Sequence, residues 1–266
     1  RRGVLMNDGK SPLAGRTILL TRERNASRQM AELIAARGGE ALIAPVMKFA
    51  PAPLSAAALN CIRGVNGFDW IVLTSANGVR YFFDVLSAQR LEIVGPKFAV
   101  VGQKTAEALE RRGIKPDLIP DDFTAEKLAD RMAAQQEKGK VLLALGTLAK
   151  DDLERRLREA GYEVARVDVY QTVLNEVARP IVQTVVAEAA VDAVVFASPS
   201  AIRFFMSMAN GLDQRAFWRR AAVACIGPVT ADAARAHGLT PSIVPATYTA
   251  HALIQGVEQY FSGQRV

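Results

Sequence analysis

The chain has 266 residues, half of them hydrophobic and 23% charged, which suits two domains of about 130 residues with separate cores. Its net charge of +6 comes without a basic stripe, a long apolar run or an export signal, so we expect a cytoplasmic protein with no nucleic-acid or membrane partner. The two cysteines and two histidines lack metal-ligand spacing and indicate neither a metal site nor a disulfide framework.

The predicted elements begin after residues 1–14, a leader that we expect to be poorly ordered. A strand at 16–22 precedes a helix with Met30, Leu33 and Ile34 on one face, and Gly38 ends that helix. A second strand follows at 40–46. The same unit of strand, helix and strand is predicted again, with strands at 140–145 and 163–170 and with Leu153 and Leu157 as the inward helix positions. Further strands are expected at 70–74, 97–101, 193–197 and 222–226, each followed by a helix.

An internal duplication underlies this pattern. The segment 69–83 recurs at 192–206, which is 123 positions later, and the segment 101–106 recurs at 226–231, which is 125 positions later. A period this long marks a duplicated domain, because solenoid repeats are about 20–50 residues long. Alternating strands and amphipathic helices favour the α/β class, with two similar Rossmann- or flavodoxin-like lobes, each a parallel sheet flanked by helices. Two such lobes imply a cleft between them.

Polar residues and glycines follow the carboxyl end of almost every predicted strand. Ligands of open parallel sheets bind beyond these ends, where helix N-termini offer N–H groups and partial positive charge to anions. Each serine, threonine or asparagine could equally serve only as the cap of its own helix, and the arginine could be an ordinary surface residue. The predicted binding residues are Arg22, Ser75, Asn77, Gly102, Thr105, Gly146, Ser198, Ser200, Gly227 and Thr230.

Several common chemistries lack their motifs. No G-x-G-x-x-G follows a strand, the run 102–105 lacks the full spacing of a P-loop, and no G-x-S-x-G is found. Cys225 lies in an apolar run and reads as a small core residue, and His237 falls in the last turn of a helix before Gly238. Catalysis would therefore rest on positioning and electrostatics.

Five segments, in their order and spacing, resemble the uroporphyrinogen-III synthase family. The resemblance extends from Gly15 to Gln259. The segments are Thr21-Arg22, the run from Asp69 to Val79, Val100-Val101-Gly102-Gln103-Lys104-Thr105-Ala106, Val169-Tyr170-Gln171-Thr172, and Cys225-Ile226-Gly227-Pro228-Val229-Thr230-Ala231.

The resemblance implies a cofactor-free lyase of heme biosynthesis that cyclises hydroxymethylbilane to uroporphyrinogen III, with inversion of ring D and loss of water. The substrate is a small polycarboxylate tetrapyrrole, which suits a basic cleft lined by helix N-termini. Transient contact with the preceding pathway enzyme is a further expectation. Tyr170 resembles the family's tyrosine and would be the catalytic residue, donating a proton to the departing hydroxyl; a purely structural strand aromatic is the alternative.

The resemblance also selects a topology in which the chain crosses between the lobes twice. The duplication alone would equally allow two sequential lobes, roughly 15–130 and 139–266. In the crossed arrangement, residues 15–46 and 174–266 form lobe 1 and residues 53–168 form lobe 2. The segments 47–52 and 169–173 would then pair as a two-stranded linker.

Three positions depart from the family pattern. Val229 and Ala197 stand where hydroxyl residues are common, and Glu23 stands where proline is common. Glu23 would repel a polyanion, so we expect it to point to solvent or to pair with a neighbouring arginine. Two other functions stay open: a two-lobed small-anion binding or sensor protein without catalysis, and a homologue that folds but turns over poorly.

Overall fold

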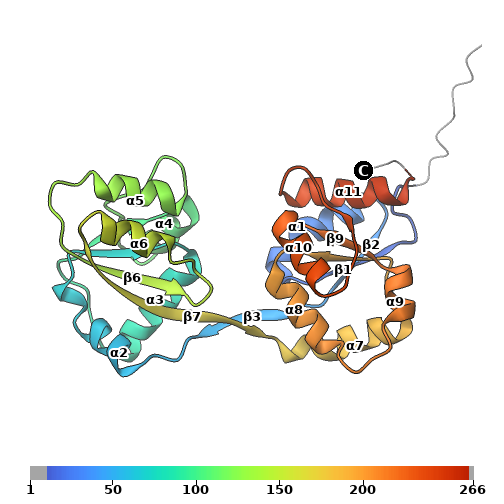
Figure 1. Ribbon diagram of the computed structural model, residues 1–266, viewed down its shortest axis with the longest axis horizontal. Helices are drawn as coiled ribbons and strands as arrows, with labels where there is room; N and C mark the ends of the chain where they lie inside the picture. Colours follow the sequence, from blue (N-terminus) through green and yellow to red (C-terminus); the bar gives the residue numbers. More distant parts are fainter. Residues whose placement is uncertain (1–10, 264–266) are drawn as a thin grey trace, which may run out of the picture. The chain divides into compact units, whose positions relative to one another are not determined.

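The computed structural model describes residues 11–263, which fall into two compact units (Figure 1). Of the described residues, 11–48 and 173–263 form the first unit, and Phe49–Thr172 form the second. The chain therefore passes from one unit to the other twice. Both passages lie within strands, one in β3 (Met47–Pro51) and the other in β7 (Glu163–Leu174).

The first unit is built on five parallel strands in the order β10-β9-β8-β1-β2. Strand β1, from the start of the chain, lies between β2 and β8, with Ile18 opposite Ala41 on one side and Ala193 on the other. This insertion excludes two sequential lobes. The elements are β1 (Thr17–Leu20), α1 (Arg24–Ala35), β2 (Glu40–Ile43), α7 (Arg179–Glu188), β8 (Ala193–Phe196), α8 (Pro199–Met208), α9 (Arg215–Arg220), β9 (Ala222–Cys225), α10 (Pro228–Ala236), β10 (Pro241–Ile243) and α11 (Ala250–Phe261).

The second unit has the strand order β5-β4-β6-β7-β3. Its strands β5, β4, β6 and β7 are parallel, and β4 lies between β5 and β6, with Trp70 opposite both Lys97 and Val141. The elements are α2 (Ala56–Arg63), β4 (Trp70–Leu73), α3 (Ala76–Ala88), β5 (Lys97–Val100), α4 (Gln103–Glu110), α5 (Ala125–Ala133), β6 (Lys140–Gly146), α6 (Asp152–Glu159) and β7, with β3 at the edge.

Each sheet is covered by helices on both faces, because alternate strand residues point to opposite sides. In β1, Leu19 joins a core with α7, α8 and α10, while Ile18 and Leu20 join a core with α1 and α11. In β4, Ile71 packs with α2, α3 and α4, and Val72 packs with α5 and α6. The predicted α/β fold class is confirmed.

Strands β3 and β7 run in opposite directions. The Asn175 N–H donates to the carbonyl of Val46 at 2.9 Å, and the Ala52 N–H donates to the carbonyl of Val169 at 3.2 Å. From Val46 to Ala52 the residue number rises along one strand, while from Asn175 to Val169 it falls along the other, so the two strands are antiparallel. The Asn175 amide adds a bond to the Pro45 carbonyl at 2.8 Å.

The duplication includes an equivalent hydrogen bond at the amino end of each sheet. The Asp69 carboxylate accepts from the Lys140 N–H at 2.7 Å, and the Asp192 carboxylate accepts from the Thr17 N–H at 2.9 Å. Both residues of the first pair lie 123 positions from their counterparts in the second. At the other edge, Ile243 of β10 faces Ala224, and 125 positions earlier Leu118 forms an isolated bridge to Ala99.

Two expectations about element boundaries need correction. Residues 1–10 of the predicted leader lie outside the described residues, but Leu13 is fully buried and its N–H donates to the Arg37 carbonyl at 2.9 Å, so the first unit begins before residue 15. The strand predicted at 163–170 and the linker segment predicted at 169–173 form one continuous strand that ends at Leu174, with β3 beside its second half. The short edge strand β10 was not predicted.

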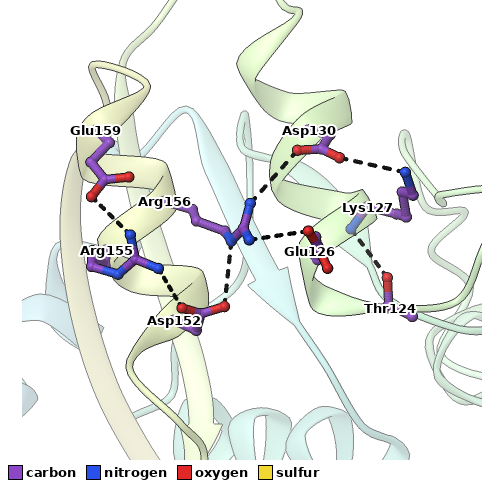
Figure 2. Close-up of polar contacts among 8 residues, drawn as sticks. All are labelled: Thr124, Glu126, Lys127, Asp130, Asp152, Arg155, Arg156 and Glu159. Carbon is purple, nitrogen blue, oxygen red and sulfur yellow. Dashed lines mark hydrogen bonds and ion pairs between the residues drawn. The ribbon is translucent and has the colours of Figure 1, made fainter.

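An exposed ionic network joins α5 and α6 (Figure 2). The Arg156 guanidinium lies 3.1 Å from the Glu126 carboxylate and 3.4 Å from that of Asp152. Hydrogen bonds from Arg155 and then Arg156 hold the pKa of Asp152 below its usual value.

Between residues 11 and 263, no helix has the length and apolarity needed to cross a membrane. The same residues contain no group of three His, Cys, Asp or Glu side chains placed to hold a metal.

Candidate functional site

Tyr170 and Ser75 meet at the carboxyl edge of the second sheet. Ser75 is the N-cap of α3 with extended backbone angles, and its Oγ accepts the Gly78 N–H at 2.9 Å. The same Oγ lies 3.1 Å from the Tyr170 hydroxyl oxygen. Either hydroxyl can donate in this contact; when Ser75 donates to the Tyr170 oxygen, the phenol proton is free to point outward.

The Tyr170 ring is held by three neighbours. It stacks on Tyr81 with the centroids 5.6 Å apart and an interplanar angle of 22°, and it meets Phe49 edge-on at 5.6 Å. On the remaining side it lies against Gly146, where an added Cβ would come within 2.5 Å of the Tyr170 Cζ. Gly146 thus makes room for the ring.

A hollow of about 280 Å³ adjoins Tyr170, and Phe49, Thr147, Leu148 and Thr172 are among its lining residues. Leu148 is 60% exposed and leaves apolar surface open at this hollow. The hollow has an open phenol, hydroxyl groups and apolar walls, which suits a ligand with both apolar and polar parts.

Arg166 anchors the loop that carries Thr147 and Leu148. Its guanidinium binds the carboxylates of Asp168 at 2.8 Å and Asp151 at 2.7 Å, and donates to the Ala149 carbonyl at 3.1 Å. Burial alone would lower the pKa of Arg166, but the bond to Asp168 and the two negative charges raise it.

Two helix N-termini begin with glycine and have no side-chain cap. They are α4 after Gly102 and α10 after Gly227. A serine-capped helix follows the neighbouring strand in each unit. In the second unit this helix is α3, capped by Ser75, and in the first unit it is α8, capped by Ser198, whose Oγ accepts the Ala201 N–H at 3.2 Å. Without a side-chain cap, the first N–H groups of these helices have no side-chain acceptor and can donate to an anion.

The first unit has a hollow of about 310 Å³ at the carboxyl edge of its sheet. Its lining includes Arg22, Met47, Ser198, Ile226 and Tyr248. The Thr21 hydroxyl donates to the Val195 carbonyl at 2.8 Å and fixes the end of β1 against β8, so the chain turns outward at the exposed Arg22.

Glu23 behaves as a helix cap. It is exposed, and its Oε1 accepts the Ala26 N–H of α1 at 3.3 Å. The chain's own carboxylate therefore occupies the N-terminus of α1, and this helix end offers less to an external anion than α4 and α10 do.

The predicted binding residues fall at these edges but in different environments. Ser75, Gly146 and Tyr170 are in contact, and Arg22 and Ser198 line one hollow. Thr105 and Thr230 are 4% and 3% exposed, and no hydrogen bond within residues 11–263 uses either hydroxyl. Asn77 lines a groove between α3 and α4 with Arg80 and Arg112, and Ser200 is half-buried in the first turn of α8.

Sequence reasoning missed the exposed apolar side chains at the same edges. They are Phe49, Phe123, Leu148 and Tyr248, each at least 43% exposed. A signal was available for two of them, because Phe123 and Tyr248 directly precede Thr-Ala pairs that are 125 positions apart.

Cys225 is fully buried, and burial raises the pKa of its thiol to about 11, so it is not a nucleophile near neutral pH.

Comparison with known proteins places the chain in a family. A family model described as uroporphyrinogen-III synthase HemD matches residues 28–255. A uroporphyrinogen-III synthase of Synechococcus elongatus is 30% identical over 259 residues, which cover 94% of this chain and 97% of the relative. A porphyrin biosynthesis protein HemD of Ruminiclostridium josui is 29% identical over 86% of this chain, which spans 46% of that relative.

A solved structure supports the fold. The crystal structure of a mutant uroporphyrinogen III synthase from the extreme thermophile Thermus thermophilus has 23% sequence identity and a TM-score of 0.58, covering 94% of this chain and 100% of the other. The family match and the 30% identical relative together identify the family. The chain therefore belongs to the uroporphyrinogen-III synthase family, whose members are hydro-lyases of tetrapyrrole biosynthesis.

Proposed function

We propose that this chain converts hydroxymethylbilane to uroporphyrinogen III, inverting ring D and releasing water. The observation that carries this proposal is the family match over residues 28–255. The site supports it, because the carboxyl edges of the sheets offer hydrogen-bond donors and apolar surface to a substrate that has both charged and apolar parts. We expect no cofactor.

The substrate's acetate and propionate groups account for the binding residues. In each unit one glycine-capped helix, α4 or α10, presents uncapped N–H groups, and Arg22 adds a full positive charge in the first unit. We assign Ser75, Asn77, Gly102, Thr105, Ser198, Ser200, Gly227 and Thr230 to carboxylate contacts or to orienting the helix ends that make them.

We assign Tyr170 the role of general acid. As the C–O bond of the hydroxymethyl group breaks, the phenol proton passes to the departing oxygen and water leaves, while the substrate carbon becomes an azafulvene cation. Ser75 donates to the phenolate oxygen that forms, which stabilises its charge. Ring closure later releases a proton from a pyrrole carbon, and that proton restores the phenol.

Most of the catalytic effect should come from holding the chain in one conformation. Free hydroxymethylbilane closes without inversion, so the protein must favour attack by the substituted carbon of ring D. Fixing the reacting ends in place contributes about 7–11 kcal/mol in favourable cases, more than a single proton donor. Loss of Tyr170 alone should therefore leave residual activity and the III isomer.

An isomer assay tests the function. The full chain is given freshly made hydroxymethylbilane, and the I and III isomers are separated after oxidation. We expect the III isomer in large excess. Product containing only the I isomer, at the spontaneous rate, would reject the proposal and favour the binding-protein alternative. Cytoplasmic location and contact with the preceding pathway enzyme stay predictions.

A further inference from the structure

We propose that the hollow at the carboxyl edge of the first sheet is a subsite for one pyrrole ring of the substrate. In this subsite Tyr248 lies against the face of the ring and Arg22 binds one of its carboxylates. The inference rests on the proposed function and adds Tyr248 to the residues that determine binding.

The size and lining of the hollow match one ring rather than a whole tetrapyrrole. Its volume of about 310 Å³ is at the lower end of ligand pockets, which span about 300–1,000 Å³. Apolar side chains, one serine and one arginine make up most of the lining, and among residues 11–263 no aspartate or glutamate contributes to it.

Arg22 is available to an anion. Its side chain is exposed, and no hydrogen bond or ion pair in the described part of the chain uses its guanidinium. The neighbouring carboxylate of Glu23 instead caps α1 through the Ala26 N–H. A guanidinium matches the two oxygens of a carboxylate, and of the described residues Arg22 alone brings a full charge to the lining of the hollow.

Tyr248 presents an open aromatic face. One side of its ring lies against the backbone of Gly227, where an added Cβ would come within 3.1 Å of the Tyr248 Cδ1. The side chain is nevertheless 63% exposed, and none of the described residues forms a hydrogen bond with its hydroxyl. A large aromatic that contacts a glycine and is nearly two thirds exposed is available to stack on a planar ring.

The second unit repeats this feature at the duplicated position. Phe123 lies 125 positions before Tyr248, is 57% exposed, and has its Cβ 3.7 Å from the place of a Cβ on Gly102, the counterpart of Gly227. The two aromatics share a position although one is Phe and the other Tyr, so the shared property is the ring and not the hydroxyl. That is the property needed to contact a pyrrole.

The test measures kinetics with hydroxymethylbilane and, separately, binding of reduced uroporphyrinogen III by calorimetry. Arg22→Gln should raise KM and the product Kd about 10-fold, as expected for losing a charged hydrogen bond. Tyr248→Leu should raise both about 5-fold, while Tyr248→Phe should match the unmodified chain because only the ring is used. Arg28→Gln, on the helix α1 that Glu23 caps, and Tyr260→Leu on α11 are the matched controls and should change neither value.

Two results would overturn the inference: normal product Kd in Arg22→Gln or Tyr248→Leu, or an equal loss in Tyr248→Phe and Tyr248→Leu. Failure of the proposed function would be seen separately, as absence of the III isomer with the unmodified chain, and the binding comparison would still decide the subsite. Coproporphyrinogen III, which has methyl groups in place of acetates, identifies the carboxylate. If the Arg22→Gln loss persists with this probe, Arg22 binds a propionate, and if it disappears, Arg22 binds an acetate.

Discussion

Replacing Gly146 by alanine should disable Tyr170 without removing it. The new Cβ would lie 2.5 Å from the Tyr170 Cζ, 2.7 Å from Cε2 and 2.9 Å from the hydroxyl oxygen. All three distances are shorter than a carbon can tolerate, so the ring must move. Movement is confined, because Tyr81 stacks on one face and Phe49 contacts the ring edge-on. The 3.1 Å contact with Ser75 is therefore lost.

The size of the effect follows from the two consequences of that movement. Overpacking a filled site costs about 1–3 kcal/mol of folding stability, which leaves a two-unit protein folded at 25 °C. General acid catalysis contributes about 10²–10⁴-fold, and we expect a misplaced donor to lower kcat by about 100-fold. In the Tyr170→Phe background the donor is already absent, so Gly146→Ala should lower kcat little further.

The assay combines steady-state formation of the III isomer with urea unfolding for each variant. Gly67→Ala is the matched control, since an added Cβ there meets no atom within 4 Å and its backbone needs no positive φ. The reasoning would be refuted if folded Gly146→Ala kept full kcat. A loss of kcat as large in the Tyr170→Phe background as in the unmodified chain would contradict it equally.

Three further predictions concern single side chains. Tyr170→Phe should lower kcat by about 100-fold or more with KM and urea midpoint unchanged, whereas Tyr260→Phe should change none of these; an unchanged kcat would reject the donor role. Asp192→Ala should lower the free energy of unfolding by about 2–3 kcal/mol, because the Thr17 N–H and two arginines lose a carboxylate that is 5% exposed; a urea midpoint equal to that of the unmodified chain would rule this out. Burial raises the folded pKa of Cys225 to about 11, above the roughly 8.5 of a free thiol, so the folded state holds a proton that the unfolded state releases. The contribution of this proton to the free energy of unfolding is complete below about pH 8.5 and is lost as pH rises toward about 11. The free energy of unfolding of Cys225→Ala should therefore fall less steeply with pH in this range. Iodoacetamide at about pH 8 should modify Cys61 before Cys225.

The architecture was predictable from the sequence because its signals are local and repeated. Apolar strands of four or five residues, amphipathic helices and a long-range repeat all point to doubly wound sheets, and the central strands begin within one residue of their predicted positions. The edge strand β10 was missed because its three residues, Pro-Ser-Ile, have no strand pattern of their own and depend on pairing with β9. The pairing of the second half of β7 with β3 was expected only from the family resemblance, because the two segments are distant in sequence.

The site was less predictable, because a residue's role depends on what packs against it. Gly146 was predicted to bind substrate from its place at a strand end, whereas the structure shows a glycine whose missing side chain accommodates Tyr170. Glu23 was expected to lie in solvent or pair with arginine, and it is exposed but caps α1. The aromatic pair Phe123 and Tyr248 was hidden because hydrophobicity alone predicts burial, and only the coordinates show that both rings are exposed.

The placement of β1 between β2 and β8 has a consequence for synthesis on the ribosome. When Thr172 has emerged, the second unit is complete and can fold, but the first unit has only β1, α1 and β2. Strand β1, with the apolar residues Ile18 and Leu20, is made about 175 residues before its neighbour β8, and α11, which packs on the same face, is made later still; the first delay alone is roughly 9–35 s at ordinary elongation rates. Nascent chains of this protein should therefore bind chaperones through β1, α1 and β2 until the strands and helices of the last third have been made.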